Sequence, residues 1–232
     1  MNFELLAQHA YSPYSKKEPE WCVIVGSSGT AYPGVRVENI SFPLTISAIH
    51  GAICSCIGNL DTPQAYISNS ARPEMLNYWV EQYGMDQLKQ LPEDVNPYDP
   101  VISNPSSAEK LLAQYTGKAV TPHSDFPVAA ILQTEAGLVP GVNVELESWA
   151  LGLCAERLAI FRAISNGFRE FSTLKVSAPK GDFSSPCGAC RQVLMEWMPR
   201  GTVELHHGDG SLSTHNTMHL LPYAFSSSKL RS

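Results

Sequence analysis

A pattern of residues near the start of the chain returns in its second half in the same order. Leu5-Leu6-Ala7-Gln8 matches Leu111-Leu112-Ala113-Gln114, and Pro33-Gly34-Val35-Arg36-Val37-Glu38 matches Pro140-Gly141-Val142-Asn143-Val144-Glu145. From Pro33 onward the matched positions stand 107 residues apart. The same spacing relates Ser41, Leu44, Ala48, Ala52, Ile53 and Asn59 to Ser148, Leu151, Ala155, Ala159, Ile160 and Asn166. An ordered series at one spacing predicts a duplicated unit of about 110 residues, a common domain size.

The stretch from Leu91 to Ser107 is rich in Pro, Asn, Asp and Ser, which is typical of a linker. We therefore expect a first unit over residues 1–100 and a second unit over residues 101–232. Ser106 and Glu109 have the spacing of a capping box, which predicts the start of a helix in the second unit.

Within the second unit, helical and extended patterns alternate. The expected helices cover residues 108–115, 154–164 and 187–197, and the expected strands cover 127–132, 141–145, 174–178 and, as the last one, 203–206. This alternation predicts an α/β fold in which helices cover both faces of a sheet.

Three of the six cysteines are placed at the expected starts of two helices. Cys154 precedes one helix, and Cys187 and Cys190 form a CxxC at the other. A CxxC alone is a weak signal, because thiol redox motifs and structural zinc sites share it. Helix N-termini stabilise thiolates, and three thiolates on a tetrahedral zinc leave one position open for water, as in catalytic sites. Glu156 would then lie beside the metal and reach that water.

Each of these residues also has a simpler interpretation. A cysteine can be a small buried apolar residue, and a glutamate is favoured in the first turn of any helix. The combination of Cys154, Glu156 and the CxxC after Pro186 favours the zinc site. Arg157 has two open interpretations, a donor of hydrogen bonds to the cysteine sulfurs or a cation paired elsewhere.

The second half resembles the cytidine deaminases, zinc enzymes that act on free nucleosides and that hold the metal through three cysteines in their small members. Their general signature is H-x-E with P-C-x-x-C, and Cys154 takes the place of the histidine. The matching motifs are Phe126-Pro127-Val128-Ala129-Ala130, Gly141-Val142-Asn143-Val144-Glu145, Cys154-Ala155-Glu156-Arg157, Ser185-Pro186-Cys187-Gly188-Ala189-Cys190-Arg191-Gln192 and Leu220-Leu221-Pro222 with Phe225.

This resemblance implies roles for individual positions. Phe126 would pack against the pyrimidine ring, and Asn143 and Glu145 would bind the ribose 3′-hydroxyl. The backbone near Ala155 and Ser185 would read the base and the leaving amine. One departure is Glu147, which stands where the family has a small residue, while Trp149 occupies the aromatic position that follows.

The first half resembles a copy that has lost its site. Ser47 and Ile49 stand in place of Cys154 and Glu156, and Pro73-Glu74-Met75-Leu76-Asn77 in place of the CxxC. We therefore expect one Zn²⁺ per chain. The arrangement resembles two-repeat, dimeric cytidine deaminases, although in the familiar form the active half comes first. The resemblance implies two tandem α/β/α three-layer units and a homodimer, in which Ile40 or Phe42, together with Phe225, would help wall the pocket.

The net charge of −6 and the pI near 5.6 disfavour a nucleic-acid partner, because phosphate backbones are bound by clustered Lys and Arg. No signal segment or membrane span is visible, so we expect a cytoplasmic protein with a small pyrimidine nucleoside as its substrate. The expected reaction is hydrolytic deamination of cytidine or deoxycytidine. The alternatives are deamination of a cytosine nucleoside antibiotic, which Asn143 and Glu145 argue against, and a non-enzymatic zinc-stabilised module.

Overall fold

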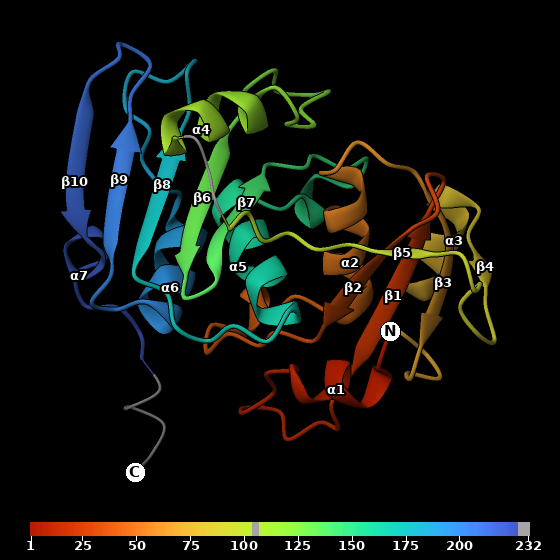
Figure 1. Ribbon diagram of the computed structural model, residues 1–232. Helices are drawn as coiled ribbons and strands as arrows, with labels where there is room; N and C mark the ends of the chain where they lie inside the picture. The colour runs from red at the N-terminus through yellow and green to blue at the C-terminus, as the bar shows by residue number, and fades with distance from the viewer. Residues whose placement is uncertain (104–106, 227–232) are drawn as a thin grey trace.

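The computed structural model describes residues 1–103 and 107–226 and contains two mixed sheets lying side by side (Figure 1). In the first sheet the strand order is β4-β3-β1-β2-β5, and in the second it is β10-β9-β8-β6-β7. The strands of the first sheet are β1 Trp21–Gly26, β2 Thr30–Val35, β3 Pro63–Ser68, β4 Asp86–Gln87 and β5 Asn96–Pro97. Those of the second sheet are β6 Ala129–Thr134, β7 Gly137–Val142, β8 Thr173–Ser177, β9 Thr202–His206 and β10 Leu212–Asn216.

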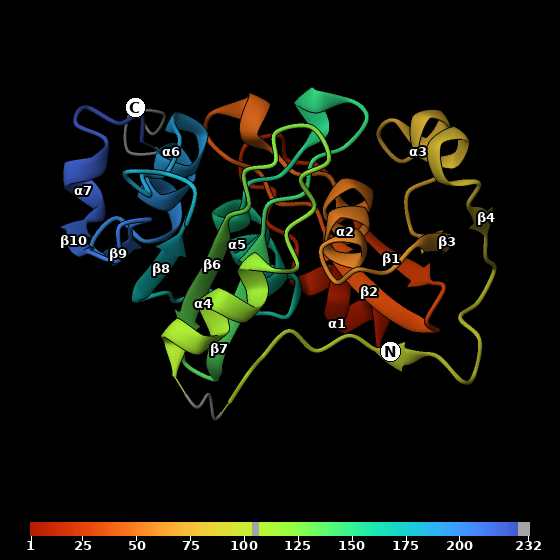
Figure 2. The ribbon, with the colours of Figure 1, turned by 90° about the horizontal axis from the view of Figure 1, so that it is seen from above.

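The helices form layers on these sheets, as the view from above shows (Figure 2). Helix α4 (Ala108–Thr116) covers one face of the second sheet, and α5 (Ala155–Ser165) covers the other. Helix α2 (Ala48–Ile57) packs on the first sheet, and α1 (Phe3–Gln8) contacts β1 and β2. The remaining helices are α3 Leu76–Tyr83, α6 Gly188–Trp197 and α7 Thr217–Leu220, with 3-10 turns at Phe42–Leu44 and Trp149–Leu151. The α/β architecture expected from the sequence is confirmed.

Corresponding elements of the two halves follow one another in the same order. The strands β2 and β7, the two 3-10 turns, and the helices α2 and α5 each begin 107 residues apart. Gly34 and Gly141 lie against the first residue of the corresponding helix in each half. A Cβ added at Gly34 would lie 2.5 Å from Ala48 O, and one added at Gly141 would lie 2.1 Å from Ala155 O. In each half, therefore, glycine permits the same close approach of helix to strand.

The two halves meet along α2 and α5 and share one continuous core. Phe161 of α5 fills the space above Gly51 of α2, where an added Cβ would lie 2.1 Å from the ring. Arg162, which is 1% exposed, donates to Ser55 Oγ at 3.0 Å and to Ser55 O at 2.9 Å. Through these buried contacts the first half packs against α5, the helix whose N-cap is Cys154.

Several boundaries differ from those expected. The strand expected at 141–145 is β7, Gly137–Val142, so Asn143 and Glu145 follow the strand. A further strand, β10, pairs antiparallel with β9 at the sheet edge; the polar Leu212–Asn216 sequence gave no apolar signal for it. The cap of α4 is Ser107, whose side chain accepts from Lys110 N at 3.1 Å. Ser106, expected to be the cap, lies outside the described residues.

Candidate active site

The three predicted zinc ligands come together where α5 and α6 begin. Cys154 and Cys187 are the N-cap residues of α5 and α6, and Cys190 lies in the first turn of α6. The Sγ atoms of Cys154 and Cys187 are 3.7 Å apart, and those of Cys187 and Cys190 are 3.5 Å apart. Sulfurs bound to one tetrahedral zinc at about 2.3 Å stand roughly 3.8 Å apart. The trio therefore fits a zinc ion.

Neighbouring groups favour a thiolate at this place. Hydrogen bonding between Cys187 and the side chains of Cys154 and Cys190 lowers the pKa of Cys187, and the backbone N–H groups of Cys190 and Ala189 lower it further. These N–H groups belong to the first turn of α6, whose unpaired donors favour negative charge. The same interactions raise the pKa values of Cys154 and Cys190, so negative charge in the trio gathers on Cys187. Metal binding would require the other two thiols to lose their protons as well.

Glu156 is buried in the first turn of α5, two residues after Cys154, and is 4% exposed. Burial, and secondarily the negative charge of Cys187, raise the pKa of this carboxyl group to about 7. A group with such a pKa is divided between its acid and base forms at neutral pH. It is therefore suited to proton transfer in both directions.

A cavity of about 210 Å³ opens over Cys154, Cys187 and Glu156. Its lining includes four of the predicted substrate-binding residues, Phe126, Asn143, Ala155 and Ser185. Phe183 and Ser184 also line it, and the sequence did not single them out, because a loop residue before a CxxC has no periodic signal. The remaining lining residues are Val128, Val176 and Ala178.

Asn143 and Glu145 hold the loop that carries Phe126. The Asn143 side chain accepts from Val128 N at 2.8 Å and donates to Phe126 O at 2.9 Å. The Glu145 carboxylate accepts from His123 N, Ser124 N and the Ser124 hydroxyl. Glu145 does not line the cavity over the cysteines; with Asn143, Trp149 and Cys154 it lines an adjoining hollow of about 230 Å³. The polar pair thus shapes the mouth of the site.

Arg157 does not donate to the cysteine sulfurs. Its Nη2 donates to Leu44 O of the first half at 3.1 Å, and the side chain lines a different cavity, with His50 and Trp79. Arg157 follows Glu156 directly, so its side chain leaves the helix on another side and meets the first half. This contact with Leu44 favours the interpretation as a cation engaged elsewhere.

Phe42 and Phe225, expected to wall the pocket, do not line it within one chain. Phe42 is 83% exposed, and Phe225 is 46% exposed with its carbonyl accepting from Gln192 Nε2 at 2.9 Å. Ile40 is buried, and its N–H donates to Glu196 Oε2 at 2.9 Å. Any contact of the two phenylalanines with an active site would have to involve a second chain.

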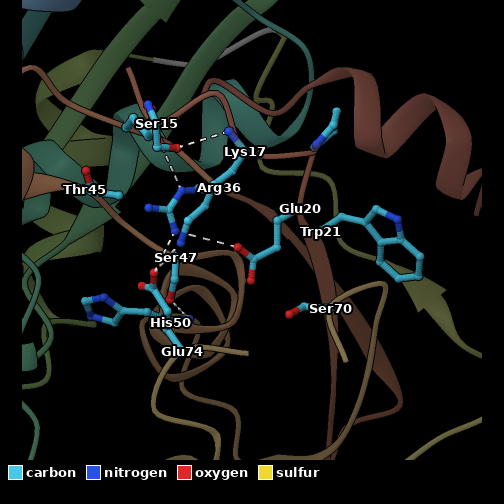
Figure 3. A network of polar contacts seen from close by, with 12 residues as sticks. Ser15, Lys17, Glu20, Trp21, Arg36, Thr45, Ser47, His50, Ser70 and Glu74 are labelled. Carbon is cyan, nitrogen blue, oxygen red and sulfur yellow. Dashed lines mark hydrogen bonds and ion pairs between the residues drawn. The ribbon is translucent and has the colours of Figure 1, made fainter. Parts of the chain in front are cut away.

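The corresponding place in the first half holds an ion cluster (Figure 3). Arg36, at the position of Asn143, donates to Glu38 at 3.0 Å and to Glu74 at 2.9 Å, and lies 3.7 Å from Glu20. Ser47 caps α2 in place of Cys154. Among residues 1–103 and 107–226, the only trio of metal-type side chains with ligand atoms close together is Cys154, Cys187 and Cys190. In the first half, therefore, charge pairing around the buried Arg36 stands where Asn143 and Glu145 stand in the second half.

Comparison with known proteins identifies the relatives of this chain. A model of the cytidine and deoxycytidylate deaminase zinc-binding region matches residues 106–204. A cytidine deaminase of Sporosarcina psychrophila is 41% identical over 130 residues, which cover 53% of this chain and 93% of that protein. A probable cytidine deaminase of Dictyostelium discoideum is 40% identical over 111 residues, covering 47% and 75%. The crystal structure of cytidine deaminase from Burkholderia pseudomallei aligns at 36% identity with a TM-score of 0.48, over 51% of this chain and 99% of that one. With the match to the bacterial relative extending over nearly its whole length, the chain belongs to the cytidine deaminase family.

Proposed function

We propose that this protein hydrolytically deaminates cytidine, deoxycytidine or both, giving uridine or deoxyuridine and ammonia. The observation that carries the proposal is one cavity in which three thiols at ligand spacing lie beside the buried Glu156. Cys154, Cys187 and Cys190 would hold the ion. Zinc bound there supplies a water molecule of lowered pKa.

Glu156 carries the protons of the reaction. The carboxylate takes a proton from the water and delivers it to ring N3, while the water oxygen forms its bond to C4. Glu156 then takes the second proton of that oxygen and gives it to the exocyclic nitrogen, the C4–N4 bond breaks, and ammonia leaves. One carboxyl group serves as base and acid in turn, which its raised pKa favours.

The rest of the lining would position the nucleoside. Phe126, 39% exposed at the cavity, presents an apolar ring for the base. Asn143 and Glu145 would bind a sugar hydroxyl. For this, their side chains would give up hydrogen bonds that they now make to the loop residues 123–128. The backbone at Ala155 and Ser185 would bind the polar edge of the base. A site built to pair a hydroxyl discriminates strongly against substrates that lack it.

We infer that the first half, residues 1–100, is a degenerate copy that supports residues 101–232, and that the protein acts as a homodimer. Phe42 and Trp149 support this inference, because they occupy corresponding 3-10 turns and are 83% and 67% exposed. A partner chain would cover these two rings, and aromatic side chains are enriched in protein interfaces. Light scattering should give twice the chain mass, and Phe42→Ala and Phe225→Ala should raise KM. The dimer would lose its support if Phe42→Ala changed neither mass nor kinetics.

Within residues 1–103 and 107–226, no helix combines the length and the apolar composition needed to cross a bilayer. All six cysteines are free. Free thiols support a reducing compartment such as the cytoplasm.

An ultraviolet assay with cytidine, deoxycytidine and a cytosine nucleoside antibiotic tests the proposal. We expect loss of the cytosine absorbance, with ammonia released in equal amount, for one or both of the natural nucleosides. Turnover of the antibiotic alone would favour the alternative substrate. No turnover in a zinc-loaded protein would favour a non-enzymatic module. A structural zinc site is usually closed by four protein ligands, and among the described residues no fourth side-chain ligand lies near the trio.

A further inference from the structure

One wall of the active-site cavity is formed by an irregular loop, outside any helix or strand. Phe183, Ser184 and Ser185 contribute to the lining just before Cys187. Ser184 is 2% exposed, and its N–H would be an unpaired buried donor without a partner from another element. The partner comes from the turn after β9, a segment that contributes nothing to the cavity lining.

His207 supplies that partner through its Nδ1 atom. The Ser184 N–H donates to His207 Nδ1 at 3.1 Å, which requires that Nδ1 carry no proton. The neutral ring then carries its proton on Nε2, which lies 2.8 Å from Ser213 Oγ. Ser213 Oγ in turn lies 2.9 Å from His215 Nε2. The chain of hydrogen bonds therefore has one direction, with donation running from the cavity wall through His207 toward the edge strand β10, and it selects one tautomer of His207.

Ring contacts and backbone bonds hold the same wall. Phe183 stacks on the His207 ring with centroids 4.5 Å apart, and it meets His215 edge-on at 6.2 Å. Ser184 Oγ donates to His206 O at 2.6 Å, and Gly208 N donates to Gly181 O at 3.1 Å. Since Phe183 also lines the cavity, the imidazole supports the wall by its face as well as by its Nδ1 atom.

We propose that neutral His207 is a positioning residue, which sets the Phe183–Ser185 wall of the substrate cavity through the Ser184 N–H···Nδ1 bond. This inference rests on the proposed function, in which the Ser185 wall meets the base. His207 touches no substrate; it acts through Ser184.

Two substitutions separate the hydrogen bond from the packing. His207→Phe keeps a ring against Phe183 but removes the acceptor, whereas His207→Asn places its amide oxygen near the position of Nδ1. His219→Phe is the matched control, since His219 is exposed on α7. We expect His207→Phe to lower kcat/KM for cytidine at least tenfold, mainly through KM, with zinc content unchanged. His207→Asn should stay within about threefold of the original protein, as should His219→Phe.

Hydrogen exchange gives a readout that does not depend on activity. The peptide containing Ser184 should exchange at least tenfold faster in His207→Phe and at the original rate in His207→Asn.

The outcomes distinguish this inference from the proposed function. An original protein without activity on any cytosine nucleoside would overturn the function, while the exchange measurement would still test the wall. Unchanged exchange and unchanged KM in His207→Phe would overturn the inference, with the function left standing. If His207→Phe does not fold, His207→Leu takes its place, and unchanged exchange and unchanged KM in that variant would overturn the inference.

Discussion

At the scale of single residues, the site depends on where a helix places its first three side chains. Cys154 caps α5 and Glu156 follows in the first turn, so one helix start carries both a metal ligand and the proton carrier. The raised pKa of Glu156 comes first from burial, which its position against the core imposes. Spacing in the sequence predicted both residues, because helix geometry fixes their relation once the helix begins at Cys154.

Replacing Glu156 tests its role directly. Glu156→Gln keeps the size and one oxygen but cannot carry a proton, so we expect kcat to fall by about 10²–10⁴-fold, the usual contribution of general acid–base catalysis. Zinc content should be unchanged, because sulfur atoms supply the ligands. Glu135→Gln, in the exposed turn after β6, is the matched control. Near-original activity in Glu156→Gln would show that another group moves the protons.

At the scale of elements, the contact between α2 and α5 joins the two halves. The His50 Nε2 of α2 lies 2.7 Å from Leu151 O, and the ring stacks on Trp79 with centroids 5.5 Å apart. Burial, and secondarily the charge of Arg157, lower the pKa of His50 to about 4 against the opposing hydrogen bond to Leu151. The folded protein therefore holds this imidazole neutral.

This buried imidazole predicts a pH dependence of stability. An unfolded histidine binds a proton below about pH 6.5, whereas His50 in the folded protein does so only near pH 4. The contribution of His50 to the free energy of unfolding is therefore fully present above pH 6.5. It declines by about 3 kcal/mol in all as the pH falls toward 4. Urea unfolding at several pH values should show this slope, and His50→Gln should remove it. An unchanged slope in His50→Gln would assign the pH dependence to other groups.

The glycine at the same contact offers a second test. In Gly51→Ala the new methyl group would meet the Phe161 ring, so we expect the free energy of unfolding to fall by about 1–3 kcal/mol, as overpacking does. Gly117→Ala is the control, because Gly117 is exposed with φ near −68° and an added Cβ has ordinary spacing. Equal stability of the two variants in denaturant unfolding would contradict the close packing of α2 on α5.

At the scale of the whole molecule, sequence reasoning reached the α/β class, the helix starts and the cysteine trio, all of which depend on local periodicity or fixed spacing. It misplaced the bounds of β7, which is apolar and almost fully buried. It missed β10, because a polar edge strand has no buried face to leave a pattern. It also gave no sign of the Ser184 wall or of the contact of Arg157 with Leu44. Such contacts depend on how separate elements meet, which no spacing along the chain encodes.

The two halves have different side chains at corresponding places. In the second half, thiols from two helix starts meet; in the first, Arg36 pairs with Glu38, Glu74 and Glu20. Arg36 and Glu38 are buried, and a buried ion pair is costly to break from one side, whereas Glu74 is about half exposed. The molecule as a whole is therefore expected to bind a single zinc ion and to catalyse only through its second half.

Titrating zinc into the metal-free protein, with cytidine deamination as the signal, tests this account most directly. We predict activity that rises linearly with added zinc and stops rising at one equivalent per chain. A break at two equivalents would place a second working site in the first half. Full activity without zinc would contradict the assignment of Cys154, Cys187 and Cys190 as the centre of the reaction.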